Sequence, residues 1–145
     1  MLFKMKYIFL LLLVITSLSA CHTTTIGYLR ADGASFNPDS LVIRKELDPD
    51  DPTDRVRIQN NAPWVTTKIQ GMLGTAPINY RLLNVKATEG GNASVFRQEI
   101  TVRGIGIMQV PLKFNAPKGR YLISLEVYNE DHTAELKDIF TFIVQ

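Results

Sequence analysis

Apolar and polar residues alternate in short runs along most of the chain after position 26. The runs are separated by clusters of glycine, proline, asparagine and aspartate, a pattern typical of half-buried β-strands joined by turns. It predicts strands at residues 26–30, 41–47, 56–59, 64–70, 78–87, 95–102, 108–114, 121–127 and 139–144. We therefore expect an all-β domain, a sandwich of about seven to nine antiparallel strands with almost no helix.

Two of these runs carry finer detail. The apolar positions change face between Leu82 and Leu83, which predicts a β-bulge at that point. In the last part of the chain, alternate residues from Tyr121 to Val127 are apolar and should face the core. A turn at 129–133 then leads into the final run, so the sequence predicts a terminal hairpin.

The first 20 residues have a different pattern, that of an export signal. A short basic start ends at Lys6, nine apolar residues extend from Tyr7 to Ile15, and a more polar segment follows. A membrane-spanning helix needs about 20 apolar residues, so a transmembrane anchor is the weaker interpretation. We expect residues 1–20 to be a removable signal peptide, 21–25 a short tether and 26–145 the folded domain.

The sequence Leu18-Ser19-Ala20-Cys21 resembles the bacterial lipobox, the processing site of lipoproteins. The resemblance implies that Cys21 receives a diacylglycerol thioether and that the chain is cut before it. Such acyl chains would anchor the protein almost permanently. His22 stands where many lipoproteins of the inner membrane have aspartate, which favours the outer membrane. The sequence leaves open whether the domain faces the periplasm or the cell surface.

Cysteine content and charge narrow the possible functions. Cys21 is the only cysteine, so the domain has to fold without a disulfide. The signal segment contains two of the 16 basic residues, and the remaining 16 − 2 = 14 balance the 14 acidic ones. A neutral domain lacks the excess positive charge of proteins that bind by neutralising phosphates. Nucleic acid is therefore not an expected partner.

The C-terminal part of the chain resembles a known fold family. Pro117-Lys118-Gly119-Arg120-Tyr121, the alternating residues after it, the polar turn and the final Phe140–Val144 segment resemble the closing strands of cadherin-like and PKD-like immunoglobulin-fold domains. The resemblance covers about residues 78–145 and implies an immunoglobulin-like β-sandwich. Together with the lipobox, it makes the chain similar to small single-domain lipoproteins of Bacteroidetes-type bacteria, some of which accompany polysaccharide-uptake systems.

Catalytic chemistry has few candidate residues in this sequence. Its two histidines are His22, next to the expected lipid anchor, and His132, in a polar turn. Ser124 with His132 and Asp131 or Asp138 would be needed for a hydrolase, and their spacing does not favour that arrangement. We therefore expect a protein that is not an enzyme.

Asp48, Asp50, Asp51 and Asp54 form an acidic, proline-containing loop. Carboxylate oxygens are ligands that Ca²⁺ prefers, so these four residues are a candidate calcium site; we expect no other cofactor. The loop lacks the glycine of an EF-hand. The alternative is a solvated loop whose charges and prolines prevent edge pairing.

Two aromatic residues are candidates for stacking against a sugar ring. Trp64 stands at the entry of a predicted strand, and Tyr128 falls opposite the inward-facing positions of its strand and should point outward. A core position for Trp64 and an ordinary cross-strand contact for Tyr128 are the alternatives. The expected function is a lipid-anchored binding or interaction module of the cell envelope, with envelope proteins or glycans as partners. The alternative is a glycan-binding accessory lipoprotein of a polysaccharide-uptake system.

Overall fold

A computed structural model describes residues 5–8 and 27–145. Cys21 and most of the expected signal peptide lie outside the described residues. The elements of the domain, in chain order, are β1 (Leu29–Arg30), β2 (Ser40–Ile43), α2 (Pro52–Gln59), β3 (Trp64–Val65), β4 (Leu73–Gly74), β5 (Asn79–Thr88), α3 (Ala93–Glu99), β6 (Thr101–Arg103), β7 (Ile107–Val110), β8 (Gly119–Tyr128) and β9 (Thr133–Val144). Within the described residues, no helix is both long and apolar enough to cross a membrane.

The strands form two main sheets and one small one. The larger sheet has the order β2-β9-β8-β5, the second has the order β3-β7-β6, and β1 pairs with β4. This arrangement confirms the all-β, sandwich-like class predicted from the alternating pattern. The expectation of antiparallel pairing throughout is wrong at one place, because β2 runs parallel to β9. Shortly before β2, Ser35 forms an isolated antiparallel bridge with Gln70.

The core lies between the sheets, where the inward-facing residues of β8 and β9 meet those of β3 and β7. Tyr121, Ile123, Leu125 and Val127 of β8 are completely buried, as their alternation predicts. The terminal hairpin is also confirmed, although β9 begins at Thr133 and is longer than predicted. Burial of these side chains is the main favourable contribution to folding, at about 1.5–3 kcal/mol for each large apolar residue.

The predicted bulge in β5 is confirmed. The register against β8 shifts between Leu82 and Asn84, so the two halves of β5 direct opposite sets of residues to the core. A second irregularity lies across β8 from it, where the β8–β9 register shifts between Ile123 and Leu125. There Asp138 adopts a left-handed backbone conformation with φ 48°. Two bulges at one level increase the local twist of the sheet.

One predicted strand, at residues 56–59, and most of another, at 95–102, are helical instead; residues 101–102 of the second belong to β6 as predicted. Residues 56–59 lie in α2, whose start is fixed by Asp51 as N-cap and Pro52 in the first turn. Residues 95–99 lie in α3, which begins after the N-cap Asn92. In both segments a capping residue outweighed an alternating pattern. The spacing of four between the buried residues Phe96 and Ile100 is also a helical spacing, which alternation alone does not recognise.

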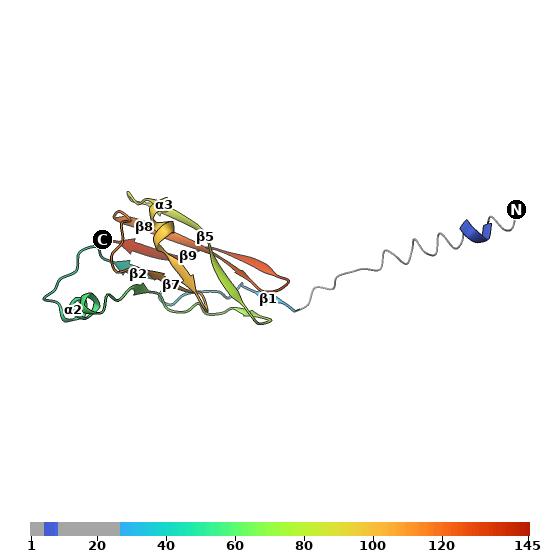
Figure 1. Cartoon of the computed structure of the whole chain (residues 1–145), viewed down its shortest axis with the longest axis horizontal. Coiled ribbons are helices and arrows are strands. Elements are labelled where there is room, and N and C mark those ends of the chain that lie inside the picture. Colours follow the sequence, from blue (N-terminus) through green and yellow to red (C-terminus); the bar gives the residue numbers. More distant parts are fainter. Residues whose placement is uncertain (1–4, 9–26) are drawn as a thin grey trace.

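Strand lengths differ from the prediction in the second sheet. The run at 64–70 contributes only Trp64 and Val65 to β3, and β7 ends at Val110 because Pro111 has no N–H to donate to the ladder. The domain is elongated along β8 and β9. Figure 1 shows that β1 lies at one end of the sandwich, whereas α2 and the C-terminus lie at the other.

Candidate functional site

Helix α2 and the start of β3 form the candidate site, at the end of the sandwich opposite β1. The helix begins where Asp51 Oδ1 accepts hydrogen bonds from the backbone N–H groups of Thr53 (2.8 Å) and Asp54 (3.0 Å). These bonds satisfy two of the donors that a helix leaves free at its N-terminus. Residues of the predicted acidic loop thus serve to start a helix.

The carboxylate of Asp54 attaches this helix to the body of the domain. Asp54 is 1% exposed, and its Oδ1 lies 2.5 Å from Arg44 Nη2. Its Oδ2 accepts a bond of 3.0 Å from the backbone N–H of Asp48. The pKa of Asp54 is lowered from its usual value of 3.8, first by the N–H of Asp48 and then by Arg44, against the opposing effect of burial. The charged form of Asp54 is therefore the form that the fold stabilises.

The four aspartates proposed as calcium ligands do not converge on one point. Asp51 caps α2, Asp54 pairs with Arg44, and Asp48 accepts a bond of 2.9 Å from the backbone N–H of Asp50. Within the described residues no group of three or more acidic, histidine or cysteine side chains has the arrangement of a metal site. The segment also differs from the alternative of a solvated loop, because its last residues begin α2 and Asp54 is buried.

Arg57 joins the last turn of α2 to the start of β3. Its guanidinium carbon lies 4.1 Å from the centroid of the Trp64 ring, a cation–π contact, and its Nη1 donates to the carbonyl oxygen of Pro63 at 3.0 Å. Asn60, the C-cap of the helix, donates from Nδ2 to the carbonyl oxygen of Val56 at 3.0 Å. The guanidinium is thereby held in one orientation at the edge of a hollow.

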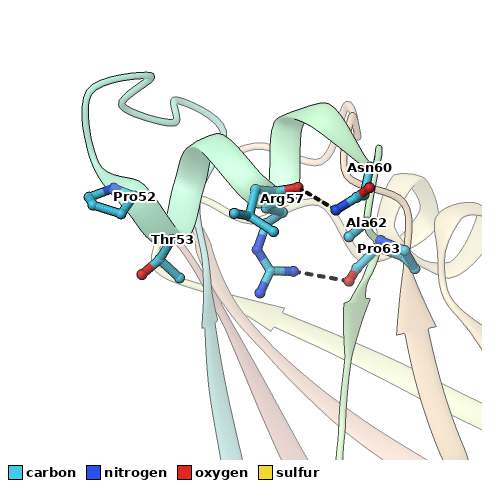
Figure 2. Close-up of a pocket in the computed structure, with 7 residues that line it drawn as sticks. Pro52, Thr53, Arg57, Asn60, Ala62 and Pro63 are labelled. Atoms are coloured by element: carbon cyan, nitrogen blue, oxygen red, sulfur yellow. Dashed lines mark hydrogen bonds between the residues drawn. The ribbon is translucent and has the colours of Figure 1, made fainter.

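This hollow is a pocket of about 630 Å³, which we call the α2 pocket (Figure 2). Its lining is largely apolar, with one guanidinium, one amide and one hydroxyl group: Pro52, Thr53, Val56, Arg57, Asn60, Ala62 and Pro63. Among these lining residues there is no acid, histidine or cysteine to serve as a general base or a nucleophile. The arrangement is suited to binding an apolar group that carries a hydrogen-bond acceptor.

Trp64 and Tyr128, the two proposed stacking residues, lie in separate sheets and do not form one site. Trp64 is 6% exposed and belongs to the core, with one ring face beneath Arg57. Its Nε1 is buried and has no hydrogen-bond partner among the described residues. Tyr128 is half-buried, and the guanidinium of Arg81, itself in contact with Glu126, lies 5.1 Å from its ring centroid. A sugar would have to compete with an arginine for a face of either ring.

Of the residues considered for a hydrolase, Ser124 contacts Asp138, whereas His132 follows Asp131 in the turn at the far end of the hairpin. Ser124 Oγ bonds to Asp138 within the β8–β9 irregularity, and Asp138 pairs with Lys86. His132 lies in the turn at the end of that hairpin, where its Nε2 is 3.0 Å from the carbonyl oxygen of Gly27. The three groups therefore have structural partners and do not form a relay.

A second pocket, of about 620 Å³, lies between the β3–β4 connection, the start of β5 and the β6–β7 turn. It is lined by Lys68, Ile69, Gln70, Gly71, Met72, Ala76, Ile78, Tyr80 and Ile105. Burial raises the pKa of Tyr80 above its usual value. Within the described residues its one charged side chain, that of Lys68, forms no hydrogen bond or ion pair, whereas Arg57 of the α2 pocket is held by Pro63 and Trp64.

Comparison with protein-family models, with curated proteins and with solved structures found no match to this chain. The sequence did not predict the α2 pocket, because Arg57 and Pro63 stand out only once the helix between them is known. One signal in the sequence could have revealed it: Asp51 followed by Pro52 is typical of a helix N-terminus. A short helix that starts there places Arg57 in its last turn.

Proposed function

We propose that this protein is a lipid-anchored immunoglobulin-like domain of the outer membrane that binds other envelope proteins and has no enzymatic activity. The lipobox-like segment ending at Cys21 supports the anchor. The observation that carries the binding function is the α2 pocket, which combines apolar walls with an oriented guanidinium and lacks acid–base groups. An extended peptide segment with an apolar side chain and a nearby carbonyl or carboxylate group fits this chemistry.

Two features support the immunoglobulin-like topology. In the larger sheet the last two strands, β9 and β8, pair with each other and lie between β2 and β5, and the second sheet is formed by β3, β7 and β6. At the start of β8, the hydroxyl of Tyr121 donates to the carbonyl oxygen of Pro117 at 2.7 Å, four residues upstream. This bond resembles the tyrosine corner of immunoglobulin-like sandwiches. The chain departs from antibody domains in having no cysteine pair and in placing its tryptophan on β3.

A protein partner is favoured over a glycan by the environment of the aromatic rings. Sugar-binding sites on β-sandwiches need a ring face that is open to solvent. Trp64 is buried, and guanidinium groups cover a face of both Trp64 and Tyr128. The α2 pocket offers no tryptophan or tyrosine among its lining residues.

Two experiments test the proposal separately. For the anchor, mass spectrometry of the wild type should detect acylated Cys21, and Cys21→Ala should release the protein from the outer-membrane fraction. For the binding surface, a photoreactive amino acid at Thr53 in living cells should give a defined cross-linked protein, and Val56→Glu should abolish that product. Ile105→Glu is the matched control, since Ile105 is 53% exposed, Val56 is 54% exposed, and Ile105 is outside the α2 pocket. Equal loss with both variants, or no cross-link at Thr53, would refute the proposed binding surface.

A further inference from the structure

The end of the domain that carries β1 and β4 has an exposed face of mixed apolar and basic character. Leu29 pairs with Gly74, and Arg30 with Leu73, while the N–H of Thr75 donates to the carbonyl oxygen of Tyr28 at 3.0 Å. Side chains alternate across the two strands, so Leu29 packs against the core and its neighbours face outward. Tyr28 is 53% and Leu73 55% exposed. We call the outward face formed by Tyr28, Arg30 and Leu73 the β1–β4 face.

The start of the domain is fixed in place at this end. Asn129, in the turn between β8 and β9, donates to the carbonyl oxygen of Tyr28 at 2.9 Å and to that of Thr75 at 3.2 Å. His132 of the same turn contacts the carbonyl oxygen of Gly27 at 3.0 Å. The chain therefore enters the sandwich at a point that is held by side chains from its longest hairpin.

The distance from this point to the proposed lipid anchor is short. Gly27 follows Cys21 by six residues, and six residues span at most about 20 Å even when fully extended. If Cys21 carries acyl chains, Gly27 cannot be further than this from the membrane surface. The β1–β4 face lies within the reach of the bilayer, whereas α2 lies at the opposite end of the sandwich (Figure 1). The 12 residues of β9 correspond to a length of roughly 40 Å.

We propose that the β1–β4 face rests on the lipid surface, so that the domain stands upright and directs the α2 pocket away from the membrane. This inference depends on the proposed lipidation of Cys21. Tyrosine is enriched at membrane interfaces, where its ring enters the headgroup region and its hydroxyl remains hydrated. The side chain of Arg30 is long enough to place its guanidinium in the hydrated headgroup region while its aliphatic part lies along the apolar edge of the bilayer. The proposed partner is therefore a bilayer surface. The exposed side chains of Tyr28 and Leu73 contact it, close to the short tether at residues 21–25.

Electrostatic attraction is not the main cause of this contact. Arg30 is paired with Asp32 at 3.3 Å, and the neighbouring turn contains the acidic residues Glu130 and Asp131. The face therefore offers little net positive charge to anionic lipids. The contact should form on neutral phosphatidylcholine and should change little with salt, unlike binding through a basic patch.

The test uses the lipidated, processed protein, residues 21–145, in phosphatidylcholine vesicles. Because acylated Cys21 has no free thiol, a newly introduced cysteine can be labelled alone with a nitroxide. Arg30→Cys reports on the β1–β4 face, and Arg55→Cys, which also replaces an exposed arginine, is the matched control on α2. We expect the label at position 30 to collide with membrane-dissolved oxygen and to be shielded from an aqueous nickel chelate. The label at position 55 should show the reverse.

A second pair of variants tests which side chains make the contact. In the Arg30→Cys protein, Tyr28→Ser with Leu73→Ser should restore access of the nickel chelate, whereas Val56→Ser with Ile58→Ser should leave it unchanged. Equal chelate access at positions 30 and 55 would overturn the proposal. Shielding of position 30 from both oxygen and the nickel chelate would also overturn it, because it indicates coverage by a second protein copy. Shielding from the chelate that persists in the Tyr28→Ser, Leu73→Ser variant would overturn it as well.

Failure of the anchor is distinguished from failure of the contact by flotation. If the wild-type protein does not float with vesicles and its Cys21 is not acylated, the proposed anchor is wrong and this inference is refuted with it. If the protein floats but position 30 is open to the chelate, the anchor stands and only the contact is refuted.

Discussion

The hydroxyl of Tyr121 connects the start of β8 to the two loops that precede it, and its removal should lower the stability of the domain. It donates to the carbonyl oxygen of Pro117 at 2.7 Å and accepts from the backbone N–H of Asn92 at 3.1 Å. The Tyr121 ring is completely buried and stacks on Phe96, with centroids 4.3 Å apart and an angle of 17°. Tyr121→Phe keeps the ring and its stacking, and it removes only the two hydrogen bonds.

The expected cost follows from those two bonds. Each lost hydrogen bond with a partly buried partner left unsatisfied costs about 1–1.5 kcal/mol, so Tyr121→Phe should lower the free energy of unfolding by about 2–3 kcal/mol. For a domain of this size, that corresponds to a fall in Tm of roughly 8–12 °C. Urea denaturation of the chain from residue 22 onward should give a lower midpoint with an unchanged slope, because the surface exposed on unfolding is nearly the same.

The matched control is Tyr128→Phe at the other end of the same strand. Tyr128 is half-buried and its ring contacts the guanidinium of Arg81, a contact that Tyr128→Phe keeps, so the free energy of unfolding should change by less than about 0.5 kcal/mol. A loss of less than about 0.5 kcal/mol for Tyr121→Phe, or an equal loss for both variants, would refute the reasoning. Burial also raises the pKa of Tyr121. Its stabilising contribution is thus complete below about pH 10 and declines as the pH rises through the raised value; Tyr121→Phe should remove this decline.

Three further predictions concern other parts of the domain. Asn129, 9% exposed, holds the β8–β9 turn to β1 and β4, so Asn129→Ala should cost about 2–4 kcal/mol in urea denaturation; an effect near zero would contradict this. The lowered pKa of Asp54 means that its contribution to stability is present above about pH 3.8 and is lost as the pH falls through the lower folded value. Asp54→Asn should therefore flatten the acid limb of the stability curve, whereas an unchanged limb would exclude Asp54 as its cause. Trp64, 6% exposed, should emit at short wavelength and resist quenching by iodide, and a red-shifted, quenchable emission would reopen the sugar-stacking hypothesis.

The sequence predicted those parts of the fold in which a strand has one buried face. The alternation from Tyr121 to Val127 identified the residues that are fully buried in β8, and the change of phase near Leu82 identified the bulge in β5. Alternate side chains of a strand point to opposite faces of the sheet, so an alternating sequence shows directly which side chains are buried. These predictions therefore need no information beyond burial. The parallel pairing of β2 with β9 was not predictable in this way, because alternation is the same in either direction.

Short helices were missed for a related reason. In α2 the residues Val56 and Ile58 alternate as in a strand, yet they are 54% and 42% exposed. In α3 only Phe96 is buried, so no apolar stripe is long enough to establish a helical period. In both cases the decisive information lies in one capping residue and its hydrogen bonds. Local hydrogen-bonding chemistry therefore has to be considered together with periodicity when a segment is shorter than about three turns.

The way in which α2 is held explains why the candidate site depends on polar contacts. Asp54 is the one buried residue of this eight-residue helix, so apolar packing contributes little to its position. An isolated helix of this length is not stable in water. Its place on the domain is instead set by the pair of Asp54 with Arg44 at one end and by Arg57 against Trp64 and Pro63 at the other. Since α2 supplies most of the residues that line the α2 pocket, the shape of the proposed binding surface depends on the charge of Asp54 and on the orientation of Arg57.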